Sequence, residues 1–178
     1  MAEIELAKKI IRDYFIHLEK NQKKFIPRKS KIPLAFPPYD AKEVCEALDS
    51  MLKLKTTMGN KVRKFESSFA KYTGTKYGIM VNSGSSANLL ALSILTNPLL
   101  RNKRIKTGDE IITPAVTWPT TVYPISNVGA IPKFVDVNLD DFSINVDEIE
   151  NSITKKTKAV MLVHLLGNPC DMRKIKKL

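Results

Sequence analysis

Apolar residues recur at helical spacing through the first 74 positions of the chain. Between residues 3 and 20 they are three or four positions apart and predict an amphipathic helix with Ile4, Ala7, Ile11, Tyr14 and Leu18 on one side. The same spacing predicts a second helix over residues 40–54 and a third through residues 62–69 that ends at Gly74. Between the first two helices, the prolines in residues 21–38 predict an extended linker.

From residue 75 onward, short apolar runs alternate with helical segments. Strands are expected at residues 77–81, 110–113, 132–137 and 159–166, and helices at residues 83–95, 120–128 and 147–153. Apolar strands separated by helices are typical of a parallel sheet covered on both faces. The predicted fold class is therefore α/β, with a mostly parallel sheet flanked by helices and preceded by a helical extension and linker over residues 1–31. Such sheets bind ligands at the carboxyl ends of their strands.

The composition narrows the function classes. With 178 residues, 43% of them hydrophobic and 26% charged, the chain is globular and neither disordered nor fibrous. Its net charge of +11 raises the question of nucleic acid, but residues 1–31 and 172–178 carry most of the surplus and no basic stripe interleaved with aromatics is present. We interpret the surplus as solvated lysines and expect no nucleic-acid partner. A positive field that favours a phosphate-bearing substrate is the functional alternative.

Membrane insertion, secretion and metal binding are not expected. The apolar run at residues 159–166 is far shorter than the roughly 20 residues of a membrane span, and the charged N-terminus is not a signal peptide. Cys45 and Cys170 lie far apart without metal or redox spacing, which predicts inert thiols in a reducing cytoplasm. No His, Cys and carboxylate residues share metal-ligand spacing, so no metal site is assigned.

The most informative segment is YGIMVNSGSSANLLAL, residues 77–92, in which a predicted strand enters a helix through a Gly/Ser turn. Backbone N–H groups at a helix N-terminus attract anions, Gly84 permits close approach of a ligand, and the Ser85 and Ser86 hydroxyls can add hydrogen bonds. A phosphate is the expected ligand of this turn, although the sequence matches neither the P-loop motif nor the dinucleotide-binding motif. The residues alone leave open an ordinary helix cap formed by Ser83 or Ser85.

Three further features follow the strands. Trp118, in TPAVTWPTT (residues 113–121), can stack on a planar ring bound at the carboxyl end of its strand, although partial burial is the commoner role of a single Trp. His164 lies within the fourth predicted strand, and we interpret it as a hydrogen-bonded core residue. Asp136 and residues 140–141 are interpreted as cap and turn residues.

Together, these segments resemble the DegT/DnrJ/StrS family of pyridoxal-phosphate-dependent sugar aminotransferases, which have the aspartate aminotransferase fold (fold type I). The resemblance rests on TTMG (56–59), KFESSFAKYTGTKYGIMVNSGSSANLLAL (64–92), GDEIITPAVTWPTT (108–121) and residues 132–171, in the family's order from about residue 32. Within the family, the chain is most similar to the sugar-nucleotide 3-dehydrases. The resemblance implies that residues 32–178 form the N-terminal part of the family's large domain, in an enzyme about twice this length.

The resemblance also implies site residues. Gly84 and Ser85 match the turn that holds the cofactor phosphate, and Trp118 matches the aromatic residue that stacks on the pyridine ring. Ser86 is a weaker candidate at the same turn, and residues 57–59 match a stretch near the substrate. The family's Asp for the pyridine nitrogen and its Schiff-base Lys, or the His that replaces this Lys in the 3-dehydrases, match no residue up to 178, so no catalytic residue is assigned.

The function implied is transamination or 3-dehydration of a nucleotide-linked 4-keto-6-deoxy sugar in O-antigen or other surface-polysaccharide biosynthesis. The cofactor would be pyridoxal or pyridoxamine 5'-phosphate, the amine donor an amino acid such as glutamate, and the assembly a homodimer. The chain by itself is expected to be inactive. One alternative is a non-catalytic half-domain or pseudoenzyme that binds only cofactor or a partner. Another, a flavodoxin- or methyltransferase-type nucleotide-binding domain, leaves the family segments unexplained.

Overall fold

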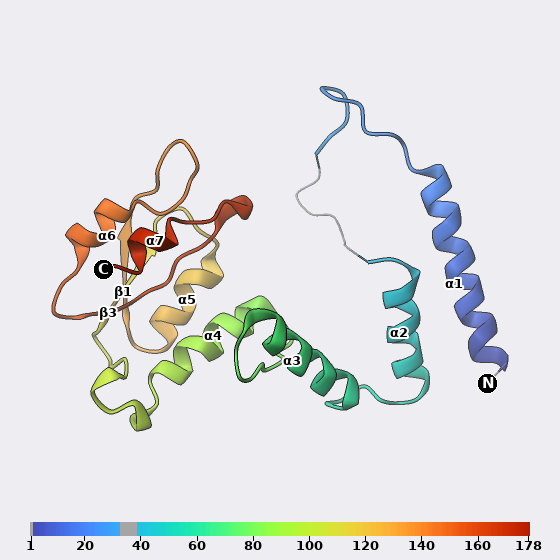
Figure 1. The fold of residues 1–178 in the computed structure, drawn as a ribbon, viewed down its shortest axis with the longest axis horizontal. Coiled ribbons are helices and arrows are strands. Elements are labelled where there is room, and N and C mark those ends of the chain that lie inside the picture. The colour runs from blue at the N-terminus through green and yellow to red at the C-terminus, as the bar shows by residue number, and fades with distance from the viewer. Residues whose placement is uncertain (1, 33–38) are drawn as a thin grey trace. The chain divides into compact units, whose positions relative to one another are not determined.

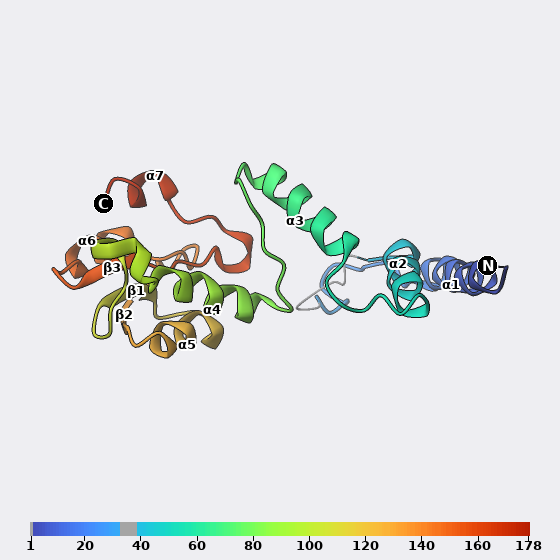
Figure 2. The ribbon, with the colours of Figure 1, turned by 90° about the horizontal axis from the view of Figure 1, so that it is seen from below.

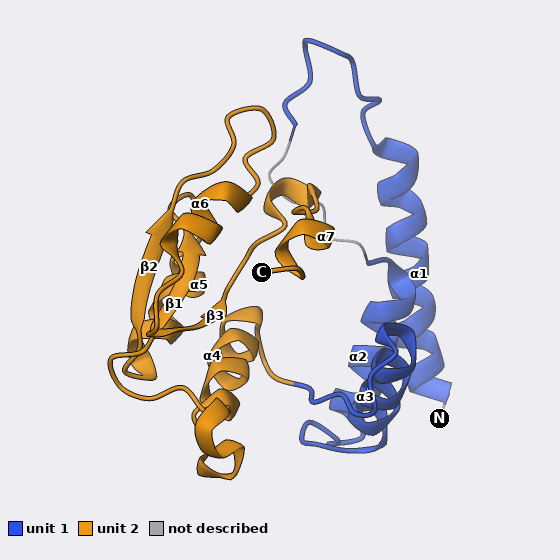
Figure 3. Cartoon of the chain, turned by 60° about the vertical axis from the view of Figure 1, so that its left-hand side comes forward, with its two compact units in different colours: residues 1–80 blue, residues 81–178 orange. Residues whose placement is uncertain are grey.

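The computed structural model describes residues 2–32 and 39–178 and has two compact units, residues 1–80 and 81–178 (Figure 3). The described residues of unit 1 form the helices α1 (Ala2–Asn21), α2 (Ala41–Leu52) and α3 (Asn60–Thr73) (Figure 1). Unit 2 contains α4 (Gly84–Leu95), β1 (Glu110–Pro114), α5 (Pro119–Asn127), β2 (Ile131–Val135), α6 (Val146–Ser152), β3 (Thr157–Val160) and α7 (Met172–Ile175). Short 3-10 helices lie at Pro98–Lys103 and Leu165–Gly167. The predicted domain boundary at residues 31/32 stays a prediction.

The sheet of unit 2 has the strand order β2-β1-β3, and both neighbours of the central strand are parallel to it. Ile112 of β1 pairs with Lys133 on one side and with Val160 on the other. This confirms the predicted α/β class with a parallel sheet, since each crossover between neighbouring strands contains a helix.

The two faces of β1 support two separate cores. Ile111 packs with Leu92 of α4 and Ile125 of α5, whereas Ile112 packs with Ile149 of α6 and with Cys170, next to α7. Successive side chains of a strand point to opposite faces, so these neighbouring isoleucines, both fully buried, separate the helices into two layers. Figure 2 shows α5 and α7 on opposite sides of the sheet.

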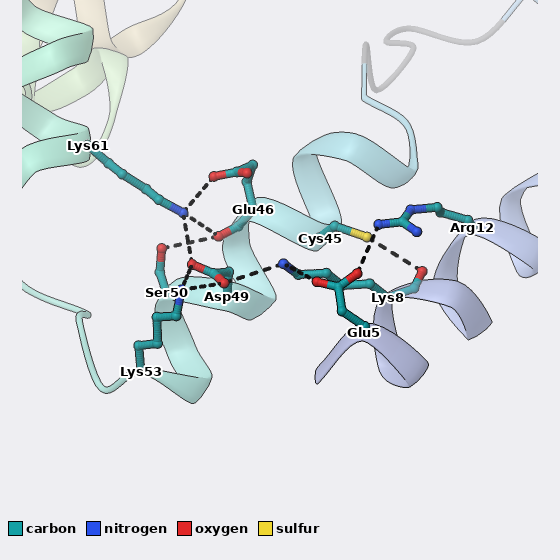
Figure 4. Close-up of polar contacts among 9 residues, drawn as sticks. All are labelled: Glu5, Lys8, Arg12, Cys45, Glu46, Asp49, Ser50, Lys53 and Lys61. Atoms are coloured by element: carbon teal, nitrogen blue, oxygen red, sulfur yellow. Dashed lines mark hydrogen bonds and ion pairs between the residues drawn. The ribbon is translucent and has the colours of Figure 1, made fainter. Parts of the chain in front are cut away.

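In unit 1, α1 is attached to α2 by a small polar network (Figure 4). Lys8 Nζ lies 3.4 Å from Glu5 Oε1 on its own helix and 3.4 Å from Asp49 Oδ1 on α2. The buried Cys45 thiol donates to the Lys8 carbonyl oxygen at 3.7 Å. The predicted helix over residues 3–20 is confirmed; of the apolar residues predicted on one side, Ile4, Ala7 and Ile11 are half-buried, whereas Tyr14 and Leu18 are exposed.

Local sequence determines where the next helices begin and end. Asp40 caps α2 in a capping box, in which its carboxylate accepts from Lys42 N at 2.6 Å and Glu43 Oε2 accepts from Asp40 N at 2.8 Å. Gly74 ends α3 in the left-handed region at φ 70°, where a glycine carries no Cβ penalty. The predicted end of this helix at Gly74 is therefore confirmed.

Three sequence expectations were wrong or only partly right. The first predicted strand, at residues 77–81, is absent: the Met80 N–H donates to Glu66 Oε1 at 2.9 Å instead of to a neighbouring strand. The fourth predicted strand, 159–166, is shorter in the structure, because β3 ends at Val160 and residues 165–167 turn into a 3-10 helix. In the predicted linker, residues 27–30 form a turn closed by Ser30 N and the Ile26 carbonyl, and residues 33–38 lie outside the described residues.

No helix in the described part of the chain is both long enough and apolar enough to cross a membrane.

Candidate functional site

The Gly/Ser turn forms the N-terminus of α4. Ser83 is the N-cap residue, and its hydroxyl accepts from Ser86 N at 3.2 Å. The N–H groups of Gly84 and Ser85, in the first turn of the helix, have no intrahelical acceptor and carry the positive end of the helix dipole. Both residues are exposed. Of the two cap residues that the sequence allowed, Ser83 is therefore the one that caps α4. The amides of Gly84 and Ser85 can still face a ligand.

The space over Gly84 is open. A Cβ placed on this residue would meet no other atom within 4 Å, in contrast to the crowded Gly78. The backbone conformation at this position does not require a glycine, because the residue lies in the regular first turn of α4. The open space is consistent with a ligand that approaches the backbone closely.

Trp118 lies at the start of α5, directly before Pro119 at the first helical position. Its side chain is 70% exposed. Most of its surface is therefore free to contact a ring. Its neighbourhood is ordered by two bonds: Thr121 N donates to the Trp118 carbonyl at 2.9 Å, and Thr117 Oγ1 donates to Thr121 Oγ1 at 2.8 Å.

The structure brings the turn and the Trp-bearing segment onto neighbouring helices of unit 2. The half-buried Asn88, one helical turn after Ser85, donates from Nδ2 to the Thr120 carbonyl oxygen of α5 at 3.1 Å. A shallow hollow of about 210 Å³ lies along this junction, lined by Ser85, Ser86, Leu89, Thr120, Tyr123, Pro124 and Asn127. Sequence reasoning missed Asn88, although its position in SGSSAN, three residues after Ser85, places it on the same side of α4.

Carboxylates with shifted pKa values lie outside the turn and have structural causes. At the amino end of β1, hydrogen bonding from Thr154, and the nearby Lys133, hold the pKa of Glu110 below its ordinary value despite desolvation. The Ser143 N–H bound to Asp141 lowers the pKa of that carboxyl. In a separate contact, Asp136 Oδ1 accepts from Val137 N at 2.7 Å, so the predicted turn roles of Asp136 and Asp141 are confirmed, while that of Asp140 stays a prediction.

The other candidate residues lie elsewhere. Residues 57–59 line a hollow of about 540 Å³ in unit 1, between the end of α2 and the start of α3. His164 is exposed and lies beyond the end of β3, so both its predicted place inside a strand and its interpretation as a core residue were wrong. Its Nδ1 does accept a hydrogen bond, from Cys170 N at 3.1 Å. The described residues contain no group of three or more His, Cys, Asp or Glu that could hold a metal ion.

Several known proteins are similar to this chain in sequence and fold. The chain is 42% identical over 159 residues to a dTDP-4-dehydro-2,6-dideoxy-D-glucose 3-dehydratase of Saccharopolyspora spinosa, covering 89% of this chain and 34% of that protein. It is 43% identical over 147 residues to a GDP-4-keto-6-deoxy-D-mannose 3-dehydratase of Escherichia coli O55:H7, covering 82% and 37%. A crystal structure of GDP-4-keto-6-deoxymannose-3-dehydratase with a trapped PLP-glutamate geminal diamine aligns with a TM-score of 0.73 at 42% identity, over 83% of this chain and 38% of that one.

The chain thus spans little more than a third of the length of these curated relatives. The match to the family profile covers residues 38–178, which include all of unit 2 and both helices α2 and α3 of unit 1. This chain belongs to the DegT/DnrJ/EryC1/StrS aminotransferase family.

Proposed function

We propose that this chain supplies the cofactor-holding part of a pyridoxal-phosphate-dependent enzyme that acts on a nucleotide-linked 4-keto-6-deoxy sugar. The observation that carries the proposal is the open N-terminus of α4 at Gly84 and Ser85, next to a helix that starts at the exposed Trp118. A phosphate needs N–H donors, and a pyridine ring needs an apolar face. The phosphate of the cofactor therefore matches the N-terminus of α4, and its pyridine ring matches the Trp118 indole.

The residues present fit this cofactor. The amides of Gly84 and Ser85 would hold the phosphate, the open space over Gly84 would admit it, and the Trp118 indole would cover one face of the ring. When bound, the cofactor supplies an electron sink for bond breaking next to the substrate's amine-bearing carbon. The protein's own contribution in this part of the chain is to bind and orient, and no residue is assigned to proton transfer.

The reaction proposed is 3-dehydration or transamination in O-antigen or other surface-polysaccharide sugar biosynthesis. Sequence identity of 42–43% to two 3-dehydratases favours dehydration. We further propose glutamate as amine donor, a homodimer as the assembly and the cytoplasm as the location. The chain by itself is expected to bind cofactor without turning over substrate. The second candidate function is a half-domain that binds cofactor or a partner only, and the exposed Trp118 is equally compatible with it.

The test uses Trp118 as a reporter, because it is the single tryptophan of the chain. Pyridoxine 5'-phosphate is titrated against pyridoxine while the indole emission is followed. Neither compound has an aldehyde, so neither reacts with surface lysines. We expect saturable quenching by both, with the phosphate ester binding roughly tenfold more tightly, an increment of about 1.4 kcal/mol.

The control variant is Gly84→Val, which fills the open space at the turn. It should reduce the affinity for pyridoxine 5'-phosphate to that for pyridoxine and leave pyridoxine binding unchanged. Absence of saturable quenching in the wild-type protein, or equal affinity for the two compounds, would overturn the proposal.

A further inference from the structure

The contact between Asn88 and Thr120 compensates for a proline inside α5. In an α-helix the carbonyl of residue 120 accepts from the N–H of residue 124, but residue 124 is Pro124, which has no N–H. The Asn88 side-chain amide occupies this vacancy from the neighbouring helix, at 3.1 Å from the Thr120 carbonyl oxygen. The missing intrahelical bond is thereby replaced by a bond between the two helices.

The position of this bond links the two halves of the proposed cofactor site. Asn88 lies three residues after Ser85 on α4, and Thr120 lies two residues after Trp118 on α5. Both partners are half-buried, and Thr120 and Ser85 line the same hollow at the helix junction. A shift of α5 along α4 would therefore change the separation between the phosphate turn and the indole.

We propose that Asn88 is a positioning residue that fixes the spacing between the phosphate turn and Trp118, so that a single ligand can engage both. The inference rests on the proposed function. Two weak contacts on one ligand reinforce each other only when their spacing matches the ligand. Loss of the bond should therefore reduce the affinity for a ligand that spans both contacts. The affinity for ligands that use only one of the contacts should not change.

The experiment compares three probes: pyridoxine 5'-phosphate, pyridoxine and inorganic phosphate. The variant is Asn88→Leu, which keeps the approximate size of the side chain and removes the donor without adding a charge. Asn127→Leu, at an exposed amide lining the same hollow, is the matched control. We expect Asn88→Leu to reduce the affinity for pyridoxine 5'-phosphate roughly tenfold and to change the affinities for the other two probes less than twofold, with the control like wild type.

A second variant tests the role of the proline. Pro124→Ala returns an N–H to residue 124, so Thr120 regains an intrahelical donor. In this background Asn88→Leu should reduce the affinity for pyridoxine 5'-phosphate less than threefold, a coupling that general destabilisation would not produce. If Asn88→Leu alone does not fold, the double variant provides the comparison with Pro124→Ala.

The outcomes separate the two proposals. Equal weakening of all three probes, no weakening of any, or an undiminished loss in the Pro124→Ala background would overturn the positioning role while the cofactor site stands. Failure of the wild-type protein to bind pyridoxine 5'-phosphate would instead overturn the proposed function.

Discussion

A Cβ on Gly78 would lie 2.7 Å from the backbone carbonyl oxygen of Glu66 on α3. The same glutamate holds the segment from its side chain, since Glu66 Oε1 accepts from Met80 N at 2.9 Å. Because the contacted atom is backbone, it cannot rotate away from an added methyl group. Gly78→Ala should therefore destabilise unit 1 by about 1–3 kcal/mol, as overpacked contacts do, measured by urea unfolding followed by circular dichroism.

The control for this change is Gly84→Ala, where an added Cβ would meet no other atom within 4 Å. Its free energy of unfolding should equal that of the wild type or exceed it slightly, because alanine is the better helix former. Equal stabilities of the Gly78 and Gly84 variants would show that the close packing on α3 is not present in solution.

Asp49 connects three lysines, Lys8, Lys53 and Lys61, and thereby α1 to α2 (Figure 4). Hydrogen bonding to Lys53 and then to Lys8, with their charges, outweighs desolvation and lowers the pKa of Asp49 below its ordinary value of 3.8. A lowered carboxyl pKa stabilises the folded contact fully above pH 3.8, and this stabilisation is lost as the pH falls through the lower folded value. Acid should therefore release α1 from α2.

The buried Cys45, whose thiol contacts the Lys8 carbonyl, reports this release. In a Cys170→Ala background, its labelling by dithiodipyridine, which reacts in acid, should accelerate as the pH falls below 3.8. Asp49→Asn should label faster than wild type already at pH 7 and lose the acid step. Asp13→Asn, an exposed carboxylate elsewhere on α1, should keep it. A pH step that survives in Asp49→Asn would contradict the assignment.

Two buried threonines of unit 2 differ in their hydrogen bonding. Among the described residues, Thr113 Oγ1 is the one buried side-chain oxygen or nitrogen without a partner, whereas the Thr121 hydroxyl accepts from Thr117 at 2.8 Å. Burying an unpaired hydroxyl costs about 1–3 kcal/mol, so Thr113→Val should stabilise the protein by about 1 kcal/mol. Thr121→Val should destabilise it by a similar amount. Thermal unfolding compares the two, and a loss of stability in both would show that Thr113 has a partner.

Sequence patterns predicted the elements whose formation depends on nearby residues. The end of α3 follows from Gly74, and the parallel strand β1 follows from an apolar run between helices. The turn at Gly84 was found because the chemistry of a helix N-terminus depends only on consecutive residues. These features need no knowledge of what packs against them.

Features that depend on distant partners could not be predicted. The apolar run at residues 77–81 has strand character, but a strand requires a neighbour, and Met80 instead donates to Glu66 fourteen residues earlier. The role of Asn88 arises from Pro124 on another helix, and a pattern along α4 cannot show it. The exposure of Trp118 likewise depends on which segments do not cover it.

Nitrogen-15 NMR can show whether the α4 turn and Trp118 bind one phosphorylated pyridine. The spectrum contains a single tryptophan indole N–H signal, because Trp118 is the single tryptophan. Titration with pyridoxine 5'-phosphate should shift this signal and the amide signals of Gly84 and Ser85 together, with one dissociation constant. Shifts confined to the lysine-rich residues 20–31 and 172–178 would show non-specific attraction of an anion and would rule out a cofactor site formed by the α4 turn and Trp118.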